Sequence, residues 1–337
     1  MDLCDIGCGM CFQQTNIPVE DVLQTKTTDG QSLVNAILGN IIRNVPVGFK
    51  HHKTPKQWVG FDLGETYEVG EIVKNQLERA QYQLGTLGNG NHFIELQKNE
   101  DGNLAIMIHS GSRNMGKQIC DYYNNLAKEL NIKWFSSIPK EFDLAFLPKD
   151  SEEGQEYWAS MQFAQIFAEE NRRRIMIQAK NVVLNMVEKY IENFKIVLDP
   201  MINAHHNYAT LEHHMGHNVI VHRKGAIRIQ KEELGIIPGS METASYIVKG
   251  KGCVMSFNSA SHGSGRRLGR IEAMRQHSCQ EVLEGMKQKG ITLCKPNKED
   301  VASECGKAYK NIDEVMDNQA EIVDIVHKLT PIGVIKG

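Results

Sequence analysis

Apolar residues recur with a helical period over four stretches of the chain. They return every three to four positions over residues 31–45, 66–84 and 115–130, and over a longer stretch from 158 to 194. Such spacing places apolar side chains on one face of a helix. We therefore expect four helices here, the last of them a surface arm or an inserted helical hairpin, with the arginines at 172–174 on its solvated face.

Other segments have the composition of β-strands. HFIELQ (92–97) and LAIMIH (104–109) are aliphatic and are separated by the polar turn KNEDGN, which predicts a β-hairpin. Strand-like runs FKIVL, NVIVHR, AIRIQ and YIVKG follow, the chain closes on IGVIKG, and helices are expected at 267–289 and 313–329. The pattern predicts one α+β domain around mixed β-sheets, with a long helical excursion at about 157–195.

Composition and charge narrow the class of protein. The 337 residues carry a formal charge of −3, so any nucleic acid would have to be gripped locally rather than by a global basic field. No apolar run reaches the length of a membrane span and the chain opens without a secretory signal, so we expect a cytoplasmic protein, monomeric by default. The eight cysteines are scattered and favour reduced thiols over a disulfide scaffold.

The opening CDIGCGMC supports two readings. Its Cys-x3-Cys-x2-Cys spacing is the cluster signature of radical SAM enzymes, which would use Cys4, Cys8 and Cys11 together. Alternatively, Asp5 and Cys8 could supply mixed oxygen and sulfur ligands to a divalent ion. These letters alone leave both readings open.

Five segments rich in Gly, His and Asn adjoin the expected strands: CDIGCGM, LGNGNHFIE, IHSGSR, NAHHNY and SASHGSGR. Taken singly, each histidine is at least as well explained as a structural residue. Together they offer a thiolate, a carboxylate and several imidazoles, which suits borderline divalent metals, two of them if the thiolate bridges. IIPGSMETAS has the content of a backbone nest for a phosphate or nucleoside.

Nine motifs stand in a fixed order: DIGCGM, GTLGNGNHFIE, HSGSR, NAHHNYA, HRKGA, IIPGSM, SHGSGR, AYKNIDEV and VIKG. In this order they closely resemble the RtcB family of GTP-dependent RNA-splicing ligases, from about residue 5 to residue 337. The resemblance implies the RtcB-like fold in a single large domain. The family segment ahead of the first motif, including a PDVH-type stretch, has no counterpart in this chain.

The resemblance also implies a two-manganese centre. In the family the cysteine of the first motif bridges two Mn²⁺ ions, which here assigns the bridge to Cys8. His92 and His109 would complete one site, and Asp5 and His206 the other. Cys4 and Cys11 are then bystanders.

The family chemistry assigns the nucleophile to His262. This histidine would attack the α-phosphate of GTP, form a guanylate and release pyrophosphate; the guanylate passes to an RNA 3′-phosphate, and a 5′-hydroxyl end expels GMP. A 2′,3′-cyclic phosphate end is opened first by metal-activated water. Arg113 and Arg266 would meet phosphates. The expected GTP contacts are Asn91, His92, Phe93, Ile94, Glu95, His206, Asn207, Pro238, Gly239, Ser240, Met241, Ser245, His262, Gly263, Ser264, Gly265 and Lys336.

Three departures from the family pattern leave alternatives. Glu242 follows PGSM where the family usually has Gly, and it would repel a polyphosphate, point to solvent or pair with Lys224. Ala204 replaces a frequent Cys, and Cys305-Gly306 replaces Ala/Ser-Pro. Glu242 and the missing family segment at the N-terminus motivate one competing reading, a two-metal RNA-end phosphohydrolase, and the other is an inactive paralogue. An archease-like activator is a further partner to consider.

Overall fold

The computed structural model describes residues 5–66, 68–142, 144–191 and 195–337. The strands are β1 (Gly9–Pro18), β2 (Phe93–Lys98), β3 (Asn103–Ser110), β4 (Ile202–His205), β5 (Asn207–His214), β6 (His217–Lys224), β7 (Ala226–Arg228), β8 (Leu234–Ile237), β9 (Ser245–Gly250), β10 (Ser259–Ser261), β11 (Thr292–Cys294) and β12 (Val323–Lys336).

The helices stand in groups between these strands along the chain. They are α1 (Val19–Gln24), α2 (Leu33–Asn44), α3 (Gly60–Thr66), α4 (Glu71–Lys74), α5 (Leu77–Gln83), α6 (Asn114–Lys133), α7 (Glu152–Tyr190), α8 (Arg270–Gln276), α9 (Cys279–Gln288) and α10 (Ile312–Asp317). Short 3₁₀ turns lie at Lys140–Phe142, Val254–Ser256, Val301–Glu304 and Gly306–Ala308.

One large sheet organises the molecule. Its strands follow the order β4-β1-β3-β2-β12-β9-β8, with β11 pairing in parallel to β12 and the other pairs antiparallel. The hairpin β5–β6 and the antiparallel pair β7–β10 form two small sheets beside it. Helices and strands thus share one domain, which confirms the expected α+β class with mixed β-sheets.

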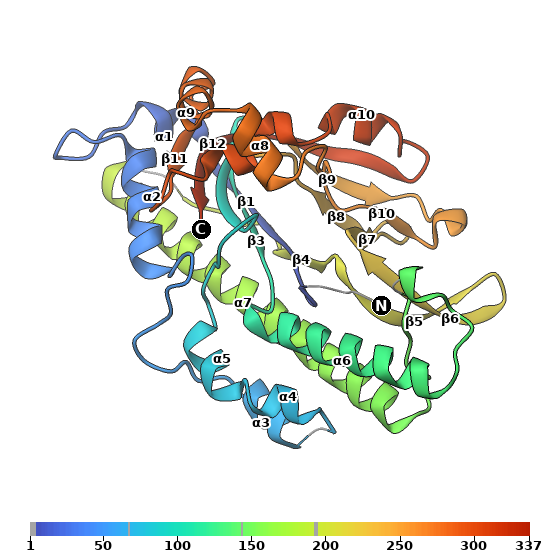
Figure 1. The fold of residues 1–337 in the computed structure, drawn as a ribbon. Helices are drawn as coiled ribbons and strands as arrows, with labels where there is room; N and C mark the ends of the chain where they lie inside the picture. The colour runs from blue at the N-terminus through green and yellow to red at the C-terminus, as the bar shows by residue number, and fades with distance from the viewer. Residues whose placement is uncertain (1–4, 67, 143, 192–194) are drawn as a thin grey trace.

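Helices α2 and α7 cover one face of this sheet. Apolar side chains of both helices, among them Ile37, Leu38, Ile175 and Met176, are buried in one core with Ile94, Leu96, Ile106 and Ile108 of the strands. Figure 1 shows α7 running across the molecule with α6 beside it. Because α7 packs on the central strands, the expectation of a surface arm or inserted hairpin is wrong, although the expected long helix is confirmed.

The sheet curls over its other face. Met10 and Phe12 of β1 share a buried cluster with Ile236 of β8 and Ile247 of β9, so the two ends of the strand order approach each other. Helices α8 and α9 with the segment 301–309 form a further cluster over the start of β11 and the end of β12. In Figure 1 this part, coloured orange to red, lies on the opposite side of the sheet from α6 and α7.

Several expected elements hold. The helices expected at 31–45 and 115–130 correspond to α2 and α6, the hairpin at 92–109 to β2–β3, and NVIVHR and YIVKG to β6 and β9. AIRIQ is shorter as a strand than expected, because β7 ends at Arg228. The run FKIVL begins at residue 194, which lies outside the described residues, and its described part makes only an isolated bridge between Leu198 and Thr15.

Three expected helices differ from the structure. The expected helix at 66–84 is two short helices, α4 and α5, and α3 already ends at Thr66. The stretch 267–289 is divided at Ser278, whose side chain forms the capping box that starts α9. The helix expected at 313–329 is wrong: α10 ends at Asp317 and the chain enters β12 at Val323. None of the described helices is long and apolar enough to span a bilayer.

Candidate metal and nucleotide site

Antiparallel pairing brings the motifs to one end of the sheet. Cys8 precedes β1 and His109 lies near the end of β3, and these ends meet because Met10 pairs with His109. The start of β2 pairs with His109 through Phe93, which brings His92 beside it. His205, the last residue of β4, pairs with Gly9, so His206 reaches the same end. The register of three strand pairs therefore gathers four sulfur and nitrogen groups.

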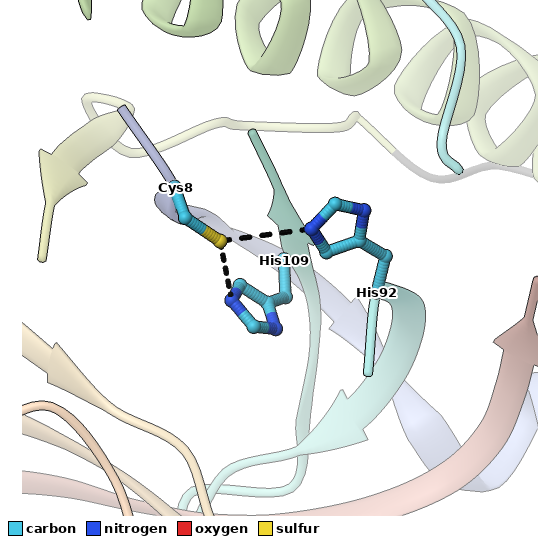
Figure 2. Close-up of side chains that lie close together, drawn as sticks. All are labelled: Cys8, His92 and His109. Atoms are coloured by element: carbon cyan, nitrogen blue, oxygen red, sulfur yellow. Dashed lines mark hydrogen bonds between the residues drawn. The ribbon is translucent and has the colours of Figure 1, made fainter. Parts of the chain in front are cut away.

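The side chains form a row of close contacts with the Cys8 sulfur at its centre. Cys8 Sγ lies 3.6 Å from His92 Nε2 and 3.1 Å from His109 Nε2, as Figure 2 shows. His92 Nε2 lies 3.5 Å from Asp5 Oδ2. At the other end, His109 Nε2 lies 3.2 Å from His206 Nε2. The five expected metal ligands are therefore brought together.

These separations fit donors that share a metal ion. A sulfur and a nitrogen about 2.3 and 2.1 Å from one ion, at angles between about 90° and 109°, lie about 3.1 to 3.6 Å apart. Cys8, His92 and His109 all face one another within 4.8 Å and are buried. The donor set of thiolate, imidazole and carboxylate suits a borderline divalent ion.

Backbone carbonyls orient two of the imidazoles. His92 Nδ1 donates to Leu87 O at 2.9 Å, and His109 Nδ1 donates to Asn91 O at 3.2 Å. With the proton held on Nδ1, each Nε2 presents its lone pair toward Cys8, as metal-binding histidines usually do. The buried Nδ1 of His206 has no hydrogen-bond partner among the described residues.

Burial keeps the imidazoles of His109 and His206 neutral. It lowers the pKa of His109 and of His206 well below the ordinary value. Burial, with the negative charge of Asp5, raises the pKa of the Cys8 thiol. Burial alone would raise the pKa of Asp5, but hydrogen bonding and charge from His92 outweigh it, so the pKa is lowered. The charge of Arg172 favours the thiolate but is outweighed, and a bound metal ion would offset the remaining cost of the buried negative charge.

A buried arginine of α7 ties the ligand-bearing segments together. Arg172 Nη1 donates to Gly7 O at 2.8 Å and to Ser110 O at 3.2 Å, and Nε donates to Asn203 Oδ1 at 2.7 Å. Its Nη2 lies 3.1 Å from His205 Nδ1. Gly7 directly precedes Cys8, Ser110 directly follows His109, and His205 directly precedes His206 in the sequence. Arg172 is completely buried, so its expected place on a solvated face is wrong.

Asn171, the residue of α7 directly before Arg172, holds neighbouring loops together by hydrogen bonds. Asn171 Oδ1 accepts from Gly85 N at 2.7 Å and from Thr86 N at 3.2 Å. Its Nδ2 donates to Ser110 Oγ and Gly111 O, both at 3.1 Å. Asn171 thereby joins the loop that leads to His92 with the end of β3. The two following arginines differ from Arg172, because Arg173 and Arg174 pair with Glu170 near the surface.

Arg113 lies beneath the glycine-rich loop before His92. Its Nε donates to Thr86 Oγ1 at 3.2 Å, and its Nη1 lies 3.4 Å from His92 Nδ1. Gly88 has a φ of +91°, and a Cβ there would come within 2.0 Å of Arg113 Nη1. Glycine is therefore required for the loop to close over the guanidinium. The structure places the expected catalytic Arg113 beside the metal ligands.

His262 follows β10 and lies beside the row of ligands. Its ring centroid is 4.9 Å from that of His206, at an interplanar angle of 76°. Gly225, with φ of +67°, packs against the imidazole, and a Cβ there would lie 3.0 Å from His262 Cε1. Burial lowers the pKa of His262, so the ring is neutral and nucleophilic near pH 7.

A pocket of about 260 Å³ adjoins both histidines. It is lined by Asn91, Phe93, Glu95, His109, His206, Pro238, Gly239, Ser240, Met241, His262, Gly263, Ser264, Gly265, Arg266, Arg270, Glu304, Tyr309 and Lys336. Most of the expected GTP contacts therefore surround one cavity. The buried Oγ of Ser264 has no hydrogen-bond partner in the described part of the chain, so it is available to a ligand.

The remaining expected contacts lie outside this cavity. Ile94 is fully buried in the core, because alternation along β2 turns Phe93 and Glu95 to the pocket and Ile94 away. Ser245 Oγ accepts from Gly239 N at 3.2 Å, and Asn207 Oδ1 accepts from Gly225 N at 3.0 Å. Ser245 and Asn207 thus hold the backbone of the pocket wall.

The sequence analysis missed an ionic cluster at the pocket wall. Glu304 accepts from Arg270 Nε at 2.9 Å and Arg266 Nη1 at 3.1 Å, and it lies 3.7 Å from Lys336 Nζ. The hydroxyl of Tyr309 also donates to Glu304. Tyr309 stands within the AYKNIDEV motif, and this motif was the available signal. Glu304 itself lies outside the motifs.

The departures from the family pattern have local explanations. Glu242 accepts a hydrogen bond from Gly306 N at 2.5 Å and lies 3.8 Å from Lys289 Nζ, so it pairs with Lys289 rather than Lys224, and its side chain is largely buried. Cys305 is buried in the cluster beneath α8 and α9. Cys11 is buried in the main core, and burial raises its pKa to about 12. Cys4 lies outside the described residues.

Comparison with known proteins agrees with this geometry. Residues 3–337 match the family described as "tRNA-splicing ligase RtcB". The chain is 32% identical to the RNA-splicing ligase RtcB of Escherichia coli K12, over 99% of this chain and 82% of the relative. It is 31% and 30% identical to the tRNA-splicing ligases RtcB of Methanococcus maripaludis and Thermococcus kodakarensis, each over 99% of this chain and 80% of the relative. The chain therefore belongs to the RtcB family.

Proposed function

We propose that this protein is a GTP- and Mn²⁺-dependent RNA ligase. It joins RNA ends bearing a 3′-phosphate or 2′,3′-cyclic phosphate to ends bearing a 5′-hydroxyl, in RNA repair or tRNA splicing. The observation that carries the proposal is that neutral His262 lies against His206, at the boundary between the row of metal ligands and the pocket. The family membership supports the same activity.

The first step uses His262 as the nucleophile. An unprotonated ring nitrogen attacks the α-phosphorus of GTP, a P–N bond forms, and the bond from that phosphorus to the bridging oxygen breaks, releasing pyrophosphate. The contact between His262 and Gly225 holds the imidazole in place. The guanylate then passes to the RNA 3′-phosphate, and the 5′-hydroxyl attacks this activated end and expels GMP.

Asp5, Cys8, His92, His109 and His206 would hold two Mn²⁺ ions, with the Cys8 sulfur at the centre of the row. When bound, such ions neutralise charge on phosphate oxygens and lower the pKa of coordinated water. The side chains of this protein supply the orientation: backbone carbonyls hold His92 and His109, and Arg172 ties the segments that carry Cys8, His109 and His206.

The pocket has groups suited to a guanine nucleotide. Glu95 is buried on the pocket side of β2, and burial raises its pKa to about 8. Hydrogen bonding from Gln97 and the charge of Lys336 favour the ionised form of Glu95, and N–H donors of a bound base would favour it further. In that form the carboxylate can accept from both N–H groups on the Watson–Crick edge of guanine, and adenine offers no matching pair. We assign guanine selection to Glu95 and Lys336.

Arginine side chains near both ends of the site favour phosphorylated substrates. Arg113 lies beside His92, and Arg266 lines the pocket with His262. Guanidinium groups bind phosphate oxygens well, in bidentate geometry. The phosphohydrolase alternative loses one of its two motives, because Glu242 is held by Gly306 and Lys289 and is not among the residues that line the pocket.

The test measures covalent attachment of labelled GMP to the protein. The purified protein is incubated with Mn²⁺ and GTP labelled at the α-phosphate, beside His262→Ala, and is denatured before detection. We expect acid-labile label on the wild type alone. RNA oligonucleotides with 3′-phosphate and 5′-hydroxyl ends should then be joined.

Absence of label on folded, metal-loaded wild-type protein would contradict the ligase proposal. If 3′-phosphate is lost from RNA in that sample without joining, the protein is a phosphohydrolase. If neither label nor phosphate release appears, the inactive-paralogue reading holds. Parallel reactions with and without an archease-like protein show whether an activator is required.

A further inference from the structure

A second polar hollow lies outside the metal and nucleotide site. It has a volume of about 440 Å³ and is formed by the loop 50–57, the end of α5 and one side of α7. Its lining is Asn44, His52, Lys56, Leu84, Gly85, Arg173, Arg174, Ile177 and Gln178. We call this the basic hollow.

Cations outnumber carboxylates at the basic hollow. The adjoining loop reads KHHKTPK, with no acidic residue, and Lys50 and Lys53 are exposed beside the lining residue Lys56. Glu170 pairs with both Arg173 and Arg174, at 2.6 Å each, and so offsets one of their two charges. In the described part of the chain no salt bridge neutralises Lys53 or Lys56. This local excess contrasts with the net charge of −3 for the whole chain.

An aromatic side chain stands at the edge of the same loop. Phe49, directly before Lys50, is 85% exposed, although phenylalanine is normally buried. A cationic groove with an exposed aromatic ring is the usual arrangement for binding single-stranded nucleic acid, because phosphates meet cations while bases stack on the ring. A small anion would make no use of Phe49. The combination favours a nucleic-acid strand.

The basic hollow and the proposed active site border the same glycine-rich segment, residues 85–92. Gly85, in its wall, is followed by Thr86, whose Oγ1 accepts from Arg113 at 3.2 Å. Arg113 in turn lies beside His92. The loop carrying the cations also bonds to the glycine-rich segment, through Gly48 N and Gly88 O at 2.8 Å. The cations of the loop and the reacting groups therefore lie on two sides of one short segment of the chain.

We infer that the basic hollow and Phe49 bind the RNA strand a few nucleotides from the end being joined. Lys53, Lys56 and the arginines contact backbone phosphates, and Phe49 stacks on a base. This inference rests on the proposed function for the identity of the nucleic acid, but its test does not require ligation.

The test measures RNA binding over a range of salt concentrations. Two fluorescent 15-nucleotide RNAs are used, one with a 5′-hydroxyl end and one with a 3′-phosphate end. The variants are Lys53→Glu/Lys56→Glu and Phe49→Ala. The matched control, Lys133→Glu/Lys231→Glu, makes the same charge change at exposed positions on other elements. Thermal unfolding confirms that each variant folds, and labelling with GTP is measured separately.

We expect the double charge reversal to weaken binding about tenfold or more and to flatten the dependence of log K on log salt by about 0.7 per lost phosphate contact. Phe49→Ala should weaken binding about fivefold or more with the salt dependence unchanged. An effect on one RNA only would identify which strand occupies the hollow. Labelling from GTP should stay at the wild-type level, because that step uses no RNA.

Wild-type affinity and salt dependence in both variants, or equal weakening by the control, would overturn the inference. Failure of the proposed function is distinguishable, since it appears as absent labelling in the wild type, whereas failure of this inference appears only in the RNA affinities.

Discussion

The ring of His262 lies against the ring of His206, with centroids 4.9 Å apart. This contact joins the proposed nucleophile to a proposed metal ligand. His206 lies between β4 and β5 and His262 directly follows β10, so the two are far apart in sequence. Gly225 also packs against the His262 ring. The proposed nucleophile is therefore positioned beside one of the proposed metal ligands.

The contact between His206 and His262 predicts that replacing each residue affects metal binding and GTP labelling differently. His206→Ala should lower metal affinity about 100-fold or more and abolish labelling from GTP, because a metal donor is removed. His262→Ala should abolish labelling but bind metal like the wild type. Titration with Co²⁺, followed by absorption, checks the first property, and covalent label checks the second. Equal loss of metal binding in both variants would contradict the assignment of His262 as a nucleophile outside the ligand set.

Cys8 and Cys11 should respond differently to the same substitution. Cys8→Ala should remove the sulfur-to-cobalt charge-transfer band, because the Cys8 sulfur faces His92 and His109. Cys11→Ala should keep the band and lower the free energy of unfolding by about 1–2 kcal/mol, because Cys11 fills the core. Loss of the band in Cys11→Ala as well as in Cys8→Ala would support a cluster-type use of the cysteines.

Arg172 should be required for a stable centre. Arg172→Met leaves the Gly7 and Ser110 carbonyls without their donor, so we expect the free energy of unfolding to fall by about 3 kcal/mol or more. Arg172→Lys should recover only part of this, because an ammonium lacks the guanidinium fork. Arg173→Met, at the surface, should cost about 1 kcal/mol or less.

Urea unfolding and Co²⁺ titration measure both effects. Metal affinity should fall for Arg172→Met and hold for Arg173→Met. If the two variants were equally stable and bound metal equally well, Arg172 would have no positioning role.

Acid should destabilise the metal-free protein before its carboxylates titrate. Burial lowers the pKa of His205 to about 3 and lowers the pKa of His109 and His206 further below the ordinary value of about 6.5. Below pH 6.5 the unfolded chain takes up protons that the folded chain does not, so the free energy of unfolding falls as pH falls. The melting temperature should therefore drop between pH 7 and pH 5, and a constant value would contradict the buried neutral histidines.

Glu304 should control nucleotide binding. It is the shared partner of Arg266, Arg270 and Lys336, and Glu304→Gln removes the charge while keeping the shape. We expect the KM for GTP in self-labelling to rise about tenfold, with a smaller change in kcat, because the cations of the pocket wall lose their common carboxylate. Glu299→Gln, at an exposed neighbouring position, is the matched control and should have wild-type kinetics.

The sequence by itself determined the residue types of the site and most of the elements that carry them. Apolar periodicity predicted α2, α6 and the β2–β3 hairpin, and the motifs predicted Cys8, His92, His109, His206 and His262. These features are local, because a helical or alternating pattern and a short motif are each contained within one segment.

Only the tertiary structure decided which distant residues each segment contacts. The stretch 323–329 reads as a helix continuation, yet it is a strand because β9 pairs with it, and no local pattern contains that partner. Arg172 reads as a surface residue beside two other arginines, yet it is buried because Gly7, Ser110 and Asn203 converge on it. Glu304 gained its role in the same way, from three cations on distant segments. The roles of these residues depend on which strands lie next to one another and on the register in which they pair.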